Sequence, residues 1–177
     1  MGEYKGEKMI WPFSKKIASE PVVPPVDLNK PVENPQLKKA INAFKANQIL
    51  KTQDDLGRQL NSANYLIAIL ADEMKTTLGE TEGQATIEKG SLIKFLNCFN
   101  EEDECFLPAF TDWEEIRLWT TQDVSTMVMP SADLWDFVLH GDQYAGVVIN
   151  PAGTLWQMSK DNIKALQEDL NKIETNK

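Results

Sequence analysis

Residues 145–158 read Ala145-Gly-Val-Val-Ile-Asn-Pro-Ala-Gly-Thr-Leu-Trp-Gln-Met158, and this stretch decides the fold. The apolar run at its start is typical of a buried strand. Asn150, Pro151 and Gly153 then occupy the first, second and fourth positions of a type I turn. Residues 154–158 return as the paired strand, so the sequence predicts a β-hairpin closed by this turn.

Helices are expected on both sides of the hairpin. Ser159 is a good N-cap for a final helix, and the apolar residues that follow it recur at helical spacing: Ile163, Leu166, Leu170 and Ile173. Upstream, Ser131 is expected to cap a helix that ends at Gly141. An apolar run over 124–129 predicts a strand that leads into that helix.

A strand followed by a helix is also expected over 105–119. Residues 105–110 are apolar, and Thr111 and Glu114 fit a capping box, in which each side chain satisfies a free backbone N–H at the start of a helix.

A hairpin is expected to join the strand at 105–110 to another strand over 92–99, through the acidic turn 100–104. If the tip of that turn is two residues long, Cys98 lies opposite Cys105 on the neighbouring strand.

The N-terminal third divides into a leader and the start of the domain. Residues 1–33 carry five prolines and no sustained periodicity, so we expect a flexible proline-rich leader. Asn34 is expected to cap a helix that starts at Pro35. The remaining elements expected here are a short helix near 52–60, weakened by Gly57, a buried strand over 64–71, and a loop over 72–90 with room for a short strand.

Together these elements predict one α+β domain over residues 34–177, after the leader at 1–33. We expect a single mixed sheet of about five to six strands packed against helices. A chain of 177 residues is long enough to build such a core without metals or disulfides.

Charge restricts the classes of partner. The chain has 27 acidic and 18 basic side chains and a net charge of −9. Ten acidic residues and only Arg117 as a base lie between Glu101 and Asp136. Such an acidic region repels phosphate backbones, which disfavours nucleic acid as a partner, and can steer a basic protein. The apolar runs are too short to span a bilayer, and two cysteines with no secretory signal predict a cytoplasmic protein.

No group of residues in the sequence indicates a catalytic centre. His140 is the only histidine, and its place at a helix end indicates a contact with the last carbonyls. Cys98 and Cys105 lack the further ligands of a metal site, which leaves two ordinary thiols or a redox-sensitive pair. The acidic run 101–104 lacks the pattern of a calcium loop. We therefore expect no enzyme activity, cofactor or metal.

Four of the five tryptophans are concentrated between residues 113 and 156. Most are expected in the core, but an aromatic side chain beside acidic residues is typical of a protein-interaction surface. The candidate surface consists of Trp113, Glu114, Glu115, Trp119 and Trp156. The candidate pocket is the turn formed by Asn150, Pro151 and Gly153, although such a turn is more often a signature of the fold than a site.

An ordered set of motifs resembles the SseB N-terminal domain family, also called enhanced serine sensitivity proteins. The set runs through Cys105-Phe-Leu-Pro-Ala-Phe-Thr111, the 113–119 helix, Val128-Met-Pro130, residues 134–141 and Gly146-Val-Val-Ile-Asn-Pro-Ala-Gly153. The resemblance covers about residues 34–170 and implies a bacterial, cytoplasmic α+β domain with no agreed active site. The second, C-terminal domain that some members carry is not expected in this chain.

Two functions are open at this point. The first is a non-enzymatic interaction or regulatory domain with an unknown protein partner, for which the acidic segment allows a basic one. The second is a sensor of an amino-acid-related metabolite, which the serine phenotype of the family motivates. We expect a monomer or a weak homodimer formed through a strand edge.

Overall fold

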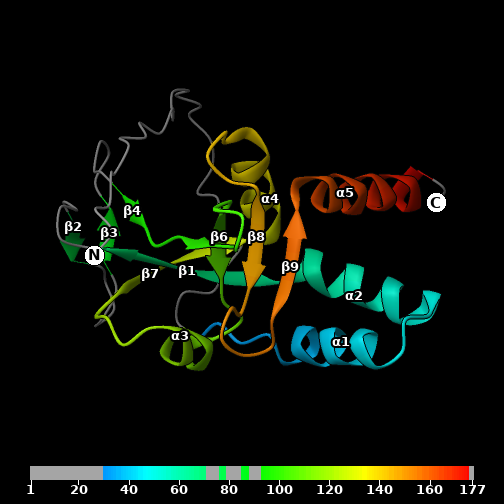
Figure 1. The fold of residues 1–177 in the computed structure, drawn as a ribbon, viewed down its shortest axis with the longest axis horizontal. Coiled ribbons are helices and arrows are strands. Elements are labelled where there is room, and N and C mark those ends of the chain that lie inside the picture. Colours follow the sequence, from blue (N-terminus) through cyan, green and yellow to red (C-terminus); the bar gives the residue numbers. More distant parts are fainter. Residues whose placement is uncertain (1–29, 71–75, 79–84, 88–92, 176–177) are drawn as a thin grey trace.

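A computed structural model describes residues 30–70, 76–78, 85–87 and 93–175 (Figure 1). This part of the chain forms one α+β domain, as expected from the sequence. The predicted leader lies almost entirely outside the described residues, so it stays a prediction. The helices are α1 (Pro35–Ala46), α2 (Leu50–Ser62), α3 (Trp113–Trp119), α4 (Ser131–His140) and α5 (Lys160–Thr175).

The strands form two main sheets and a separate two-stranded pair rather than one sheet. The antiparallel sheet has the order β4-β1-β7, formed by β1 (Asn64–Leu70), β4 (Lys94–Phe95) and β7 (Ser125–Pro130). The mixed sheet has the order β5-β6-β8-β9, formed by β5 (Cys98–Phe99), β6 (Cys105–Ala109), β8 (Gly146–Ile149) and β9 (Trp156–Ser159). In the predicted 72–90 loop, two short strands, β2 (Thr76–Leu78) and β3 (Ala85–Ile87), pair with each other.

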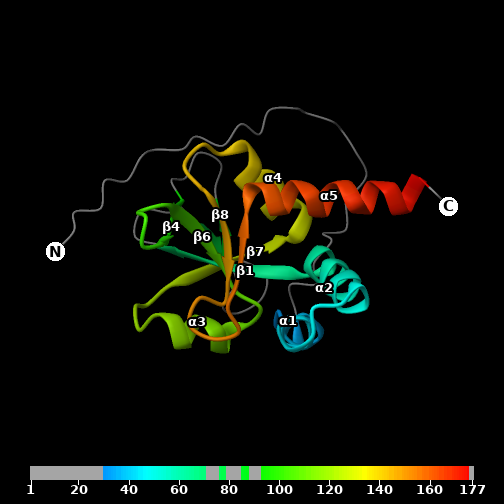
Figure 2. The ribbon, with the colours of Figure 1, turned by 45° about the vertical axis from the view of Figure 1, so that its right-hand side comes forward.

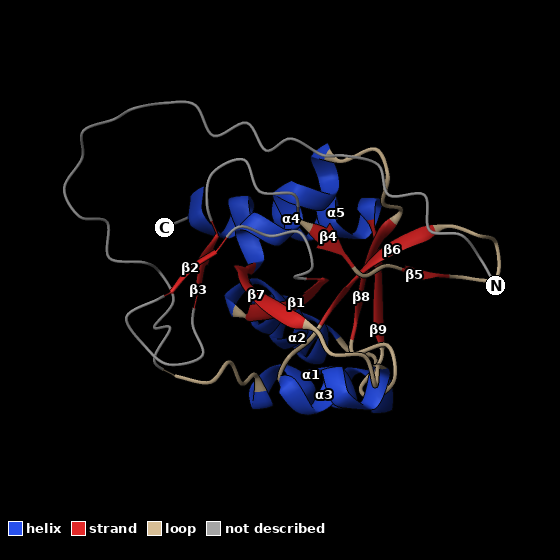
Figure 3. Ribbon diagram, turned by 90° about the vertical axis from the view of Figure 1, so that its left-hand side faces the viewer, coloured by secondary structure: helices blue, strands red, loops and turns tan. Residues whose placement is uncertain are grey.

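The two sheets meet at a single bridge. The backbone N–H groups of Leu66 and Phe110 donate to each other's carbonyl oxygens, both at 2.9 Å, so β1 pairs antiparallel with the residue that follows β6. Figure 3 shows α4 and α5 on one side of the strands and α1 and α3 on the other. The largest core side chain is Trp135, which is 1% exposed and lies against Tyr65. Burying one such side chain contributes about 1.5–3 kcal/mol.

The predicted strand over 92–99 is wrong in one respect, because the chain breaks it into two. β4 pairs with β1 in one sheet, and β5 pairs with β6 in the other. Residues 96–97 therefore carry the chain from one sheet to the next. Sequence periodicity detects a strand conformation but not the identity of the neighbouring strand, so it could not find this break.

The β5–β6 hairpin is confirmed, but its register differs by one residue. Cys98 pairs with Phe106, and Phe99 pairs with Cys105. The cause is a three-residue tip, in which Asp103 takes a left-handed conformation with φ 59°. Loops of this length are common in hairpins. Because side chains alternate along a strand, the two thiols point to opposite faces of the hairpin.

Two of the four predicted N-caps, Thr111 and Ser131, are wrong, and Asn34 lies at the predicted N-cap of α1 without the expected side-chain hydrogen bond to the helix. Asn34 donates to the carbonyl oxygens of Asn64 and Thr111, at 2.8 and 2.9 Å. Asp112, rather than Thr111, caps α3 by accepting from the Glu115 N–H at 3.0 Å. Ser131 donates to the carbonyl of Asn61. Only Ser159 acts as expected, accepting from the Asn162 N–H at 3.2 Å.

The acidic segment does not form one face. β6 and β8 are parallel neighbours, so α3, which follows β6, lies near the carboxyl ends of these strands. α4 leads into the start of β8 and lies at their opposite ends, as Figure 1 shows. Within the segment, Glu115 is buried rather than solvated. The expected acidic surface is thus distributed over separate parts of the molecule.

Candidate functional site

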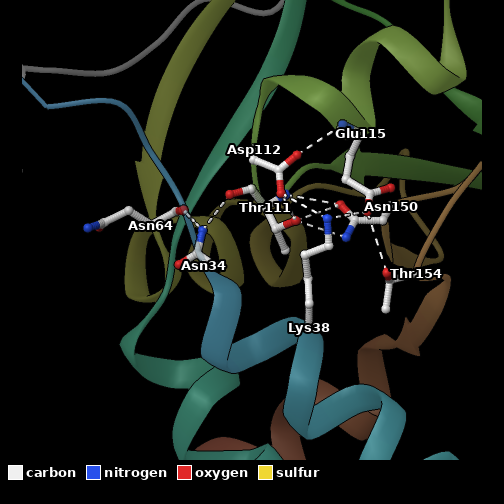
Figure 4. A network of polar contacts seen from close by, with 8 residues as sticks. All are labelled: Asn34, Lys38, Asn64, Thr111, Asp112, Glu115, Asn150 and Thr154. Atoms are coloured by element: carbon white, nitrogen blue, oxygen red, sulfur yellow. Dashed lines mark hydrogen bonds and ion pairs between the residues drawn. The ribbon is translucent and has the colours of Figure 1, made fainter.

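A cluster of polar side chains lies at the carboxyl ends of β6 and β8. Because the two strands are parallel neighbours, the residues that follow them meet at the same sheet edge. The N-terminal part of α1 covers this edge (Figure 4). We call this cluster the polar clip; its members are Asn34, Lys38, Thr111, Asp112, Glu115, Asn150 and Thr154.

Asn150 holds the predicted turn and ties it to the end of β6. Its φ of 50° is in the left-handed region, which Asn tolerates better than most residues. Its Oδ1 accepts from the Thr111 N–H at 3.0 Å, and its Nδ2 donates to Thr111 Oγ1 at 3.0 Å. The Gly153 N–H donates to the Asn150 carbonyl at 3.1 Å, which confirms the predicted turn.

Glu115 is the most deeply buried charge of the clip. The residue is 2% exposed, and its Oε1 lies 2.8 Å from Lys38 Nζ. The Thr154 hydroxyl donates to the same oxygen at 3.4 Å. The second oxygen, Oε2, is buried and has no hydrogen-bond partner among the described residues. It occupies the place of a Gly153 side chain, since a Cβ added there would lie 1.9 Å from it.

Contacts within the clip favour the charged forms of Lys38 and Asp112. The hydrogen bond to Glu115 outweighs partial burial and raises the pKa of Lys38 above its usual value. Burial alone would raise the pKa of Asp112, but hydrogen bonds from the Glu115 N–H, Lys38 and Thr111 outweigh burial and lower it. Lys38 therefore remains an ammonium and is a poor base or nucleophile at neutral pH. The clip stabilises charge and joins α1, α3 and the β8–β9 turn.

Figures 1 and 2 show that α2 and α5 extend beyond the sheets on the same side of the molecule. Residues of both helices line a groove. Its volume is about 1030 Å³. We call it the α2–α5 groove. Its apolar lining comes from four elements: Phe44 of α1, Leu56, Gly57 and Leu60 of α2, Trp156 and Met158 of β9, and Ala165 and Leu166 of α5. Its polar lining includes Lys51, Gln53, Asp54 and Arg58 of α2.

Trp156 lines the α2–α5 groove. Its ring contacts Phe44 edge to face, with centroids 5.6 Å apart and an interplanar angle of 87°. Its indole Nε1 is buried and has no hydrogen-bond acceptor among the described residues. A buried N–H without an acceptor costs about 1–3 kcal/mol.

The five residues of the predicted interaction surface do not form one surface. Trp113 is 41% exposed and Glu114 is exposed, both on α3. Trp119 is half-buried against Phe110, with ring centroids 5.3 Å apart. Glu115 is buried in the polar clip, so its assignment to an exposed surface is wrong. Trp156 alone lines the groove.

The predicted pocket residues lie in the turn next to the polar clip, away from the groove lining. Asn150 is fully buried, and Gly153 packs on Glu115. Pro151 is half-buried. These contacts explain why the turn carries these residue types, and no contact among them marks Pro151 as a binding residue.

Several residues that define both regions were missed from the sequence. Lys38 looks like an ordinary helix-surface lysine, and nothing in its neighbours indicates a buried acid 77 residues further on. Gly57 was detectable, because a glycine inside a helix is unusual, but it was interpreted only as a weakness of the helix. Leu166 was expected on the apolar face of the final helix, not in a groove.

The two cysteines and His140 have ordinary environments. Both thiols are free. Burial raises the pKa of Cys98 to about 11, with a smaller contribution from Cys105, and its Sγ donates to the Phe106 carbonyl at 3.6 Å. His140 Nδ1 lies 2.8 Å from the Asp136 carbonyl, the helix-end contact expected for it. In the described part of the chain, no group of His, Cys, Asp or Glu is placed to hold a metal ion.

The fold and the clip define the class: a small α+β domain whose parallel strand ends are joined to an N-terminal helix by buried polar contacts. The profile of the SseB protein N-terminal domain matches residues 37–165, which is most of the chain. The chain therefore belongs to the SseB N-terminal domain family, as the ordered motifs indicated. Comparison with curated proteins and with solved structures gave no match. None of the described helices is both long and apolar enough to cross a membrane.

Proposed function

We propose that this domain is a non-enzymatic protein-interaction module and that its docking site is the α2–α5 groove. One observation carries the proposal: apolar side chains from four elements line the groove together with Trp156, whose buried N–H has no acceptor among the described residues. Tryptophan is enriched among the residues that dominate binding energy at protein interfaces. Apolar side chains of a partner would cover this lining and pack against the Trp156 ring.

The shape of the groove favours a protein segment over a small molecule. Its volume of about 1030 Å³ is at the upper end of the range for ligand pockets. Two of its walls are helices that extend beyond the sheets (Figure 1). Apolar grooves between helices commonly bind a helix of a partner through its apolar face. The free thiols are compatible with a reducing, cytoplasmic setting for this interaction.

A peptide library displayed on phage and selected against the folded protein tests the proposal. Binding peptides should retain their affinity for a Ser62→Gln variant, because Ser62 is exposed on α2 and lies outside the groove. They should lose at least tenfold in affinity for Gly57→Gln, which places a long side chain in the groove without removing any core atom.

The circular dichroism spectrum of each variant controls for folding. A library that yields no binding peptide, or peptides that bind Gly57→Gln as tightly as the unmodified protein, would contradict the proposed docking site.

A second candidate function is the sensing of an amino-acid-related metabolite at the β8–β9 turn. Glu115 Oε2 supports it, because this buried oxygen has no donor and lies directly beneath the exposed Gly153. An ammonium group from a ligand could supply the donor. A ligand at 100 times its Kd would stabilise the fold by about 2.7 kcal/mol.

Thermal-shift measurements with the standard amino acids at millimolar concentration test this candidate. A rise in Tm that disappears in Thr154→Val would support a site beside Glu115, since Thr154 donates to that side chain. Unchanged melting temperatures across the whole set would argue against metabolite sensing at this turn.

A further inference from the structure

Leu50 and Gly57 on α2 suggest which protein occupies the α2–α5 groove. Leu50 is 78% exposed, the highest value among the large apolar side chains of the described residues. Gly57 lines the groove. The two residues are seven positions apart, about two turns, so they lie on the same face of the helix. This face of α2 therefore carries an exposed leucine and, about two turns away, a glycine with no side chain.

The packing of one chain does not require glycine at position 57. A Cβ added there would lie 3.4 Å from Leu166 Cδ1, an ordinary van der Waals contact. Glycine in a helix interior is nevertheless less favourable than alanine. The gap above Gly57 thus has no explanation within the monomer, and a docked side chain would explain it.

The charges of α2 are also suited to pairing with themselves. The helix carries two acidic and two basic side chains and is neutral, whereas the whole chain has a net charge of −9. Lys51 and Asp54 both line the groove and have no ion-pair partner among the described residues. Two copies of this acidic protein can therefore approach through α2 without the repulsion that other surfaces would produce.

We propose, resting on the interaction function above, that the occupant of the groove is a second copy of this chain. The two α2 helices pack antiparallel about a two-fold axis near Gln53 and Asp54. In that arrangement Leu50 of each copy lies over Gly57 and Leu166 of the other. Lys51 of each copy lies close to Asp54 of the other. The contact is the same from both sides, so it closes as a dimer and leaves no free surface for further addition.

The mass of the protein in solution, measured by sedimentation equilibrium over a range of concentrations up to about 1 mM, tests the proposal. The unmodified chain should rise from 20.0 kDa toward twice that mass. Leu50→Lys should weaken the dimer at least tenfold, because it places a charge on the apolar contact. Leu118→Lys is the matched control, since Leu118 is 65% exposed on α3. It should dimerise as the unmodified chain does.

A cysteine placed near the axis tests the geometry. In a Cys98→Ser, Cys105→Ser background, Gln53→Cys should form an intermolecular disulfide under mild oxidation, whereas Gln59→Cys, outside the groove lining, should not. A protein that stays at 20.0 kDa throughout would overturn the proposal, and so would equal effects of Leu50→Lys and Leu118→Lys. If displayed peptides still bind the groove of such a monomer, the interaction function stands and only the second copy is wrong as its occupant. If neither a dimer nor a peptide is found, both fail.

Discussion

The polar clip and the α2–α5 groove differ in how many of their side chains have bonding or packing partners within the same chain. In the clip, Asn150 and Thr111 exchange hydrogen bonds, and Lys38 pairs with Glu115 and Asp112. At the groove, the Trp156 N–H has no acceptor among the described residues, and Leu50, which lies next to the lining residue Lys51 on α2, is 78% exposed. The clip satisfies most of its polar groups within one chain, and the groove leaves apolar and polar groups available.

The clip therefore stabilises the fold, and the groove is the region that we propose for binding. The residues that form the family's motifs, such as Asn150 and Gly153, are used to hold strands and helices together. The groove is built from side chains that carry no motif. Changes in the clip should therefore alter the free energy of unfolding, whereas changes at exposed groove residues, such as Lys51 and Gln53, should alter binding with little loss of stability.

The largest expected effect is that of Lys38→Met. Removing the ammonium leaves Glu115 buried without its counter-charge, and breaking a buried ion pair in this way typically costs 3–5 kcal/mol. Because the Lys38 side chain is 30% exposed, we expect about 3 kcal/mol, the lower end of that range. Urea unfolding followed by tryptophan fluorescence measures the loss. Lys39→Met, at the exposed neighbouring position, should change stability by less than about 0.5 kcal/mol. Equal effects of the two substitutions would show that the ion pair contributes nothing.

The next largest effect is expected for Gly153→Ala. The new methyl group would collide with Glu115 Oε2 and force it away from Lys38, at a cost of about 2 kcal/mol. Shortening the acid relieves the collision, so the cost of Gly153→Ala should be smaller in a Glu115→Asp background. A double-mutant cycle by urea unfolding measures this coupling. Strictly additive effects would mean that the two residues do not compete for the same space.

A smaller, pH-dependent effect is expected for Asp112→Ala. Loss of the α3 cap and of the Lys38 contact should cost about 1–2 kcal/mol at neutral pH. The folded pKa of Asp112 is lowered, so its charge stabilises the fold above the unfolded pKa, about 3.9. That contribution is lost as the pH falls through the folded pKa. The difference between the variant and the unmodified protein should therefore shrink below about pH 4. A difference that stays constant between pH 7 and pH 2 would contradict this assignment.

The sequence predicted most of the elements because local patterns determine them. Apolar runs and periodic stripes located β1, β6, β8 and all five helices, and the turn at 150–153 followed from its residue types. The sequence did not predict the contacts of side chains that bond to a distant residue instead of a local one. Thr111 fits a capping box, but it bonds to Asn150, 39 residues away. Glu115 looks like a surface acid for the same reason, since its partner Lys38 belongs to another helix.

The smallest expected effect on stability is a gain, from Gly57→Ala. Alanine is favoured over glycine in a helix interior, and the added methyl group fits against Leu166, so the fold should gain about 0.5–1 kcal/mol. The same methyl group reduces the space that Leu50 of a second copy would fill, so self-association should weaken while Tm rises. Because most substitutions that weaken binding also weaken the fold or leave it unchanged, opposite signs in Tm and in the dimer Kd would assign Gly57 to the groove's function. A gain in stability with an unchanged dimer Kd would instead place the contact between copies elsewhere on the molecule.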